Sequence, residues 1–342
     1  MNRTAALFAG ALIGLALCAG SAAAQPAPGG SGLKVVTSIA PPPDSWDYAS
    51  WDAARGRVYV AHGDEVMSID AATGKVTPVL AQGSHLHAVV PIPGSEVLVT
   101  TNSGDNTARI INAADGSLVA SLKVADDADS AIYDPVSKLV VVVSGDGGTV
   151  SLVDPAARTV VGTIKVGGSL EFPALDGKGK LFVNQENTGS IVVIDMSKRA
   201  VATTYVMKDC KSPTGLAYVS GDRLIAACRN NVAKIVDAST GNEIASLAIG
   251  GFPDAVIYDP TRNLAYIPCA LDGTLQVISL SGPTNNTVID KVATQIGART
   301  GAVDPASGRV YLPTAEYILP VPAGQRPTTK LGTFRVLVLD RQ

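Results

Sequence analysis

AIYDPVSKLVVVVSGDGGTVSLVDPAARTVVGTIKV, residues 131–166, contains the pattern that decides the fold. It holds short runs of β-branched and aliphatic residues, and Pro, Gly or Asp separates each run from the next. Runs of this kind between turn-forming residues are typical of β-strands. We expect four strands here: Ala131–Asp134, Leu139–Val143, Val150–Asp154 and Val160–Val166.

The same pattern recurs along the chain with a period of about 42 residues. A residue pair of the Ile/Val-Asp type ends each third strand, with spacings of 42, 42, 41, 42, 42 and 61. These pairs are Ile69-Asp70, Ile111-Asn112, Val153-Asp154, Ile194-Asp195, Val236-Asp237, Ile278-Ser279 and Leu339-Asp340. The turns after the first strands fall at Asp52, Pro91, Asp134, Asp176, Tyr218, Asp259 and Asp304. This repetition predicts an all-β fold, a seven-bladed β-propeller with four-stranded antiparallel blades.

The two ends of the chain indicate how the ring closes. The seventh repeat stops after its third strand, Phe334–Asp340, while the strand Leu33–Ile39 precedes the first repeat without a place in it. Pairing strand 33–39 in the last blade would remove two exposed sheet edges. We therefore expect residues 33–342 to form a single propeller domain closed by its N-terminal strand.

Composition excludes two broad classes of protein. Of the 342 residues, 46% are hydrophobic and 17% charged, and the net charge is only -3, which argues against disorder. Nucleic-acid binding would require a clustered basic surface, which a slightly acidic chain does not suggest. The 34 Gly and 21 Pro residues fit the many turns of a propeller.

The N-terminus reads as a secretory signal. Residues 1–24 combine Arg3, an apolar run and a small-residue site, so we expect cleavage after Ala24. Residues 25–32 are expected to form a flexible leader. No other segment reaches the length of a membrane span. We therefore expect a periplasmic or secreted monomer without a membrane span.

The repeats carry a resemblance to a known family. Val58-Tyr59-Val60-Ala61, Leu181-Phe182-Val183-Asn184 and Arg309-Val310-Tyr311-Leu312 resemble the repeats of the YVTN-repeat (YncE-like) seven-bladed propellers. The resemblance covers residues 33–342. It implies the fold and leaves the function open, because the repeated residues build blades.

Propeller topology predicts which residues surround one mouth of the channel. Aligning the first strands on their turns places Asp47, Leu86, Asp129, Glu171, Pro213, Asp254 and Arg299 at one equivalent position. His85 and His87 flank Leu86. The second strands end nearby at His62, Asn102, Glu186, Arg229 and Glu316. The opposite face carries the basic turns 55–57, 136–138, 178–180, 261–262 and 307–309.

This acidic mouth is the candidate ligand-binding site. We expect ligand contacts from Asp47, His85, His87, Asp129, Glu171, Asp254, Arg299, Glu186 and Arg229. Carboxylates and imidazoles together suit a divalent metal ion as cofactor, held by His85, His87, Asp129, Glu171 and Asp254. Crowded carboxylates also raise one another's pKa values, which would provide a general base. The alternatives are that the aspartates cap turns and that a histidine stacks on Tyr48.

Three further features of the mature chain carry predictions. Cys210 and Cys228 fall in one hairpin, so we expect them to form a disulfide, with Cys269 a buried free thiol. Residues 313–333 lengthen the seventh repeat, and we expect this loop to act as a lid or as a docking site. Trp46 and Trp51 are expected to pack between blades.

Three functions fit these features. The first is an exported propeller that binds a small ligand, a cation or a periplasmic protein partner at the acidic mouth. The second is a metal-dependent hydrolase of the lactonase kind. The third, suggested by resemblance to propeller dehydrogenase subunits, is an accessory subunit of an exported quinoprotein system.

Overall fold

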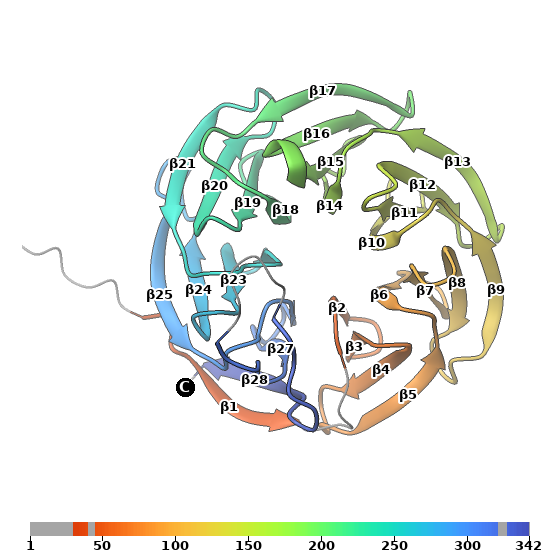
Figure 1. The fold of residues 1–342 in the computed structure, drawn as a ribbon, viewed down its shortest axis with the longest axis horizontal. Helices are drawn as coiled ribbons and strands as arrows, with labels where there is room; N and C mark the ends of the chain where they lie inside the picture. Colours follow the sequence, from red (N-terminus) through yellow and green to blue (C-terminus); the bar gives the residue numbers. More distant parts are fainter. Residues whose placement is uncertain (1–29, 40–44, 321–326, 342) are drawn as a thin grey trace, which may run out of the picture.

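The computed structural model describes residues 30–39, 45–320 and 327–341, which form a ring of seven four-stranded antiparallel sheets around a central channel (Figure 1). The predicted fold is confirmed. In each blade the first strand lies beside the channel and the last strand lies at the rim, as β2 (Ala49–Asp52) and β5 (Val76–Gln82) do in the first blade (Figure 1).

The first four blades follow one another along the chain. Blade one comprises β2 (Ala49–Asp52), β3 (Arg57–His62), β4 (Glu65–Asp70) and β5 (Val76–Gln82). Blade two comprises β6 (Leu86–Pro91), β7 (Val97–Asn102), β8 (Thr107–Asn112) and β9 (Leu118–Lys123). Blade three comprises β10 (Ala128–Asp134), β11 (Leu139–Ser144), β12 (Thr149–Asp154) and β13 (Thr159–Lys165). Blade four comprises β14 (Leu170–Leu175), β15 (Lys180–Gln185), the 3₁₀ turn η1 (Glu186–Thr188), β16 (Ser190–Asp195) and β17 (Ala200–Val206).

The last three blades complete the ring. Blade five comprises β18 (Pro213–Val219), β19 (Arg223–Cys228), β20 (Val232–Asp237) and β21 (Glu243–Ala248). Blade six comprises β22 (Ile257–Asp259), β23 (Leu264–Cys269), β24 (Thr274–Ser279) and β25 (Thr287–Ala293). Blade seven comprises β26 (Ala302–Val303), β27 (Val310–Thr314), β28 (Arg335–Arg341) and β1 (Leu33–Ile39).

The middle strands of each blade are apolar along nearly their whole length because both faces are buried. In β11, four consecutive valines, residues 140–143, are fully buried. Val143 and Leu152 of blade three pack against Leu181 and Val192 of blade four. A strand covered by a neighbouring blade on each side has no solvent face, so the usual alternation of polar and apolar residues is lost.

The predicted closure is confirmed. β1 pairs antiparallel with β28, from Leu33 opposite Arg341 to Ile39 opposite Val336. Immediately before β1, the backbone amide and hydroxyl of Ser31 donate hydrogen bonds to Asp290 of blade six, at 2.7 and 2.6 Å. The end of the expected leader is therefore held against the ring.

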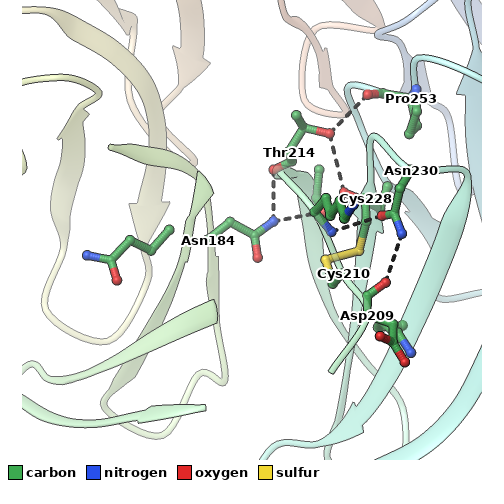
Figure 2. The surroundings of a disulfide bond; sticks show 12 residues. Asn184, Asp209, Cys210, Thr214, Cys228, Asn230 and Pro253 are labelled. Carbon is green, nitrogen blue, oxygen red and sulfur yellow. Dashed lines mark hydrogen bonds between the residues drawn. A yellow bond between two sulfur atoms is a disulfide. The ribbon is translucent and has the colours of Figure 1, made fainter. Parts of the chain in front are cut away.

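The predicted disulfide lies in blade five. Cys210 precedes β18 and is bonded to Cys228, the last residue of β19, with 5.5 Å between their Cα atoms (Figure 2). Cys269 is a buried free thiol, as expected, and burial raises its pKa to about 12. The signal peptide, residues 1–24, and most of the leader lie outside the described residues. Within the described ranges no helix is long and apolar enough to span a membrane.

An aspartate follows or ends the first strand in five blades, and its carboxylate caps the turn that comes next. These residues are Asp52, Asp134, Asp176, Asp259 and Asp304. In blade three, for example, Asp134 accepts the backbone amide of Val136 at 3.0 Å. The aspartates that anchor the repeat in the sequence are thus fixed by the turns they cap.

Candidate functional site

Strand register identifies one equivalent position per blade at the channel mouth. Trp51 pairs with Val58 in blade one and Pro91 pairs with Leu98 in blade two, so Ile92 matches Asp52. In every blade, the residue five positions before the one that matches Asp52 occupies the channel mouth. These residues are Asp47, His87, Asp129, Glu171, Thr214, Asp254 and Arg299.

Two predicted members of this position are therefore wrong. Blades two and five have Ile92 and Val219 where the other blades have an aspartate, and this absence displaced the sequence alignment by one residue. Leu86 points into the core between blades one and two and is 2% exposed. The equivalent residue is His87, and in blade five Thr214 replaces Pro213.

A break in the first strand sets the position apart from the regular sheet. The ladder between first and second strands shifts register in four blades, at Leu86/Val89, Ala128/Ala131, Leu170/Pro173 and Pro213/Leu216. In five blades, the residue two positions before the mouth residue has a positive φ angle. These residues are His85, Asp127, Ser212, Phe252 and Gly297. Bulges redirect side chains at the rims of sheets, and here they free these residues from the ladder.

The mouth side chains surround a cavity of about 160 Å³. Its lining consists of Asp47, Tyr48, His87, Asp129, Glu171, Arg229, Phe252, Asp254, Arg299 and Pro327. Seven of the nine predicted ligand contacts are therefore brought together. His85 and Glu186 do not line the cavity: the His85 ring stacks on His87 at 4.8 Å, and Glu186 lies 3.8 Å from Arg229.

His87 connects two carboxylates on one side and a hydroxyl on the other. Its Nδ1 lies 2.6 Å from Oδ2 of Asp47 and 3.3 Å from Oδ1 of Asp129. Its Nε2 lies 2.9 Å from Oγ of Ser103, a residue that the sequence did not indicate. Burial alone would lower the pKa of His87, but the hydrogen bond to Asp47 and the neighbouring negative charges raise it.

These contacts form the candidate metal centre. One ligand atom from each of Asp47, His87 and Asp129 lies within 4.8 Å of the others. The cluster adds Asp47 to the metal ligands expected from the sequence. It leaves out the other three expected ligands, His85, Glu171 and Asp254.

Two carboxyl groups of the cavity hold protons unusually tightly. Burial, followed by the charge of Asp47, raises the pKa of Asp129 from its ordinary value of 3.8 to about 7. Burial and the charges of Asp129 and Asp254 raise the pKa of Glu171 well above its usual range. The Glu171 carboxyl has neither a hydrogen bond nor an ion pair with any described residue. Burial and the neighbouring negative charges therefore favour the neutral forms of these two carboxyl groups.

Two arginines line the cavity beside Asp254. Asp254 lies 3.3 Å from Nη2 of Arg229 through one oxygen and 3.3 Å from Nε of Arg299 through the other. The Arg229 guanidinium lies over the Phe252 ring at 4.8 Å, and that of Arg299 lies over Trp46 at 5.2 Å. These contacts fix both guanidinium groups, and Nη2 of Arg299 also lies 3.9 Å from Oδ1 of Asp47.

The predicted packing of the tryptophans is confirmed. Trp46 contacts Phe334 with 5.7 Å between ring centroids, and Trp51 stacks on Tyr311 at 6.4 Å. The alternative that a histidine stacks on Tyr48 is wrong: the His85 ring stacks on His87, and Tyr48 contacts Phe172.

The inserted loop reaches the cavity. Its two described arms are joined by hydrogen bonds from Ile318 to Thr328, at 2.8 Å, and from Lys330 to Glu316, at 2.7 Å. Pro327, at the start of the second arm, lines the cavity. Residues 321–326 of this loop lie outside the described residues, and its role as a lid or docking site stays a prediction.

The fold and the mouth cavity define a seven-bladed propeller with an ionisable channel mouth. No family model matches the chain, and no curated protein matches it. Among solved structures it is similar to a chain of the Kuenenia stuttgartiensis hydrazine synthase, with 14% identity, 81% of this chain and 94% of that chain covered, and a TM-score of 0.71.

Two further solved structures share the ring. A chain of the mitotic checkpoint complex is 15% identical, with 92% and 96% of the two chains covered and a TM-score of 0.69. The structure of U3-55K is 9% identical, with 91% and 99% covered and a TM-score of 0.75. At these identities the likeness shows the propeller fold alone.

Proposed function

We propose that this protein is a propeller that binds a divalent metal ion at its channel mouth through Asp47, His87 and Asp129. The observation that carries the proposal is the convergence of one imidazole and two carboxylates within 4.8 Å. Mixed nitrogen and oxygen donors suit Zn²⁺ or Mn²⁺ better than Ca²⁺, which prefers oxygen ligands alone.

The contact of Ser103 with His87 supports the same proposal. Metal-binding histidines usually form a hydrogen bond through the ring nitrogen that does not face the metal. Here Nε2 contacts the Ser103 hydroxyl at 2.9 Å, while Nδ1 faces both carboxylates. Ser103 would therefore orient the imidazole toward the ion.

The charge balance of the cavity also favours a cation. Asp129 and Glu171 both have raised pKa values because their charges are buried beside other negative charges. A bound dication would stabilise the ionised forms of these groups and displace their protons. Metal binding is therefore expected to release protons.

We propose export to the periplasm or to the medium as the setting, and membership of the YVTN-repeat family as the ancestry. The Cys210–Cys228 disulfide supports an oxidising compartment. The quinoprotein-subunit alternative stays a prediction, and co-purification of a redox partner would test it.

Isothermal titration of the purified mature protein with Zn²⁺ and Mn²⁺ tests the metal site. We expect one equivalent to bind, and His87→Ala and Asp129→Asn to weaken binding at least about 100-fold. Asp146→Asn is the matched control, because Asp146 lies on an exposed loop and contacts Ser169 at 2.9 Å. The absence of binding to the wild type, or equal binding by all variants, would contradict the proposal.

Glu171 favours a second candidate function, hydrolysis of a lactone or ester. A carboxyl with a raised pKa in the same cavity can act as a general base toward water. Glu171 would take a proton from the attacking water, the acyl C–O bond would break, and the alkoxide leaving group would receive the proton. A bound metal would polarise the carbonyl.

A screen of the metal-loaded protein against lactones and esters tests this second function. We expect Glu171→Gln to lose turnover although it still binds the metal ion, because Asp47, His87 and Asp129 remain. Turnover that is unchanged in Glu171→Gln would remove this role, and an inactive wild type would remove the hydrolase function altogether.

A further inference from the structure

A second cavity, of about 360 Å³, lies farther along the channel than the metal cavity. The Tyr48 ring lines both cavities and contacts Phe172 at 4.9 Å between centroids. Tyr48 is therefore shared by both cavities, whereas Phe172 lines only the second, which we call the apolar chamber. The chamber is lined by the first strands β2, β6 and β10, which face the channel (Figure 1), and by the turns that follow them.

Small side chains open this side of the channel. Ala49, Ala88 and Ala131 line the chamber from three successive blades. Between blades five and six the backbones approach closely, because an added Cβ at Gly215 would lie 2.4 Å from the Ala255 carbonyl carbon.

The chemistry of the chamber is that of a small-molecule site. Its wall is mostly apolar, with Val89, Val90 and Ile132 beside the alanines. The Ser50 hydroxyl is buried and has no hydrogen-bond partner among the described residues. An apolar cavity of about 300 Å³ or more with a few polar groups is the usual form of a ligand pocket.

The outer rim of the chamber supplies a positive charge. Pro93 and Tyr133 line both the chamber and an adjoining groove of about 350 Å³, which also contacts Lys138. The Lys138 ammonium has no ion pair with any residue in the described ranges. Asp154 also lines the groove, but its carboxylate accepts backbone amides at 2.9 Å from Ala156 and Ala157.

We propose that the apolar chamber binds the alkyl chain of a small anionic amphiphile, such as a medium-chain fatty acid, with the carboxylate toward Lys138. The alkyl chain would contact the apolar wall as far as the Tyr48 and Phe172 rings. The headgroup would lie in the adjoining groove, where its charge complements the lysine. This site is separate from the metal centre and does not depend on it.

Titration of the mature protein with decanoate, decanol and decyltrimethylammonium tests the proposal. We expect decanoate to bind with the highest affinity. Ser50→Phe should abolish binding because it fills the chamber, and Lys138→Gln should weaken decanoate about fivefold without affecting decanol. Lys138 lies on an exposed turn, so this variant tests the site even if Ser50→Phe fails to fold.

Metal titration of the same variants provides the control, because their metal affinity should equal that of the wild type. No binding of decanoate would overturn the proposal. Equal affinities for the three amphiphiles, or decanoate affinity unchanged in Lys138→Gln, would also overturn it. Failure of the metal titration in the wild type would instead count against the proposed function alone.

Discussion

Blades one, three and six each carry two aspartates five residues apart, one at each end of the first strand. The turn-side aspartates are Asp52, Asp134 and Asp259, and the mouth-side aspartates are Asp47, Asp129 and Asp254. The same residue type thus occupies two environments within one short segment, repeated in three blades.

The turn-side carboxylates are satisfied by their own turns. Asp259 is fully buried, yet it accepts backbone amides from Thr261 and Arg262 at 3.0 and 3.1 Å. The mouth-side carboxylates meet groups from other blades instead. Asp47 contacts His87 from the next blade, and Asp129 shares that contact.

This difference separates a structural carboxylate from a functional one. Local amide donors stabilise the ionised form wherever the turn forms, so the turn-side aspartates contribute to folding. The mouth-side groups concentrate like charges without local donors, which costs folding free energy and suits binding of a cation. The same aspartate-to-asparagine substitution, made once at the turn side and once at the mouth side, tests this distinction.

The largest expected effect is loss of stability at the turn side. Asp259→Asn should lower the free energy of unfolding by about 2 kcal/mol, because an amide group replaces an anion that accepts two backbone amides and pairs with Arg262. Urea denaturation at pH 7 measures the change. A loss below about 0.5 kcal/mol would mean that the turn does not depend on the carboxylate.

The same substitution at the mouth side should act in the opposite direction. At pH 8, Asp129→Asn should raise the free energy of unfolding by about 1–2 kcal/mol, because it removes a buried charge whose pKa is about 7. The wild type binds this proton more tightly when folded, so it loses stability as pH rises from about 4 to about 7.

Urea denaturation at several pH values measures this second effect. The gain in Asp129→Asn should therefore be nearly gone at pH 4, where the wild-type carboxyl is protonated in the folded state and about half protonated in the unfolded state. A gain that is equal at pH 4 and pH 8 would show that packing, rather than charge, determines the result.

A smaller effect is expected on metal affinity as the pH changes. The pKa of His87 is raised above its ordinary value of 6.5, and a protonated imidazole cannot bind a metal ion. Affinity should therefore increase from pH 6 to pH 8, by about tenfold or more, since carboxyl protons also leave. Titration calorimetry in buffers of different ionisation enthalpy measures both affinity and released protons. Affinity that falls over this range would exclude His87 as a ligand.

The smallest expected effect concerns a charge partner of the turn-side aspartates. Arg55 lies 2.8 Å from Asp52, whose carboxylate also accepts the amides of Ala54 and Arg55. Arg55→Gln should lower the free energy of unfolding by about 1 kcal/mol or less, because the backbone donors remain. A loss as large as that of Asp259→Asn would show that the ion pair, rather than the turn amides, stabilises the carboxylate.

The sequence allowed the fold to be predicted because six of the seven blades are built from contacts within about 42 residues, and the unplaced strand 33–39 indicated how the seventh is completed. It also indicated Asp129, Glu171 and Asp254, since each lies five residues before an aspartate that anchors the repeat. His87 was assigned as a neighbour of the mouth position rather than as its occupant, because Ile92 replaces that aspartate in blade two.

The rest of the site depends on distances between blades, which no local pattern encodes. Ser103 follows the last residue of β7 and meets His87 only when both strands are folded. The one sequence feature that could have indicated Ser103 is its position directly after the end of a second strand, where the other mouth residues of the second strands were sought. The arrangement of Arg229 and Arg299 around Asp254 joins three blades and leaves no mark in the repeat.

The closing strand also constrains when the ring can form. Ser31 and Arg341, which contact each other, are 310 residues apart in the chain. Blade seven therefore stays incomplete until the C-terminus is available, and two open sheet edges are exposed during that interval. Contacts between such distant residues slow folding, and exposed edges invite aggregation. The completion of this one sheet is therefore expected to set the folding rate and to govern the protein's exposure to proteases before the ring closes.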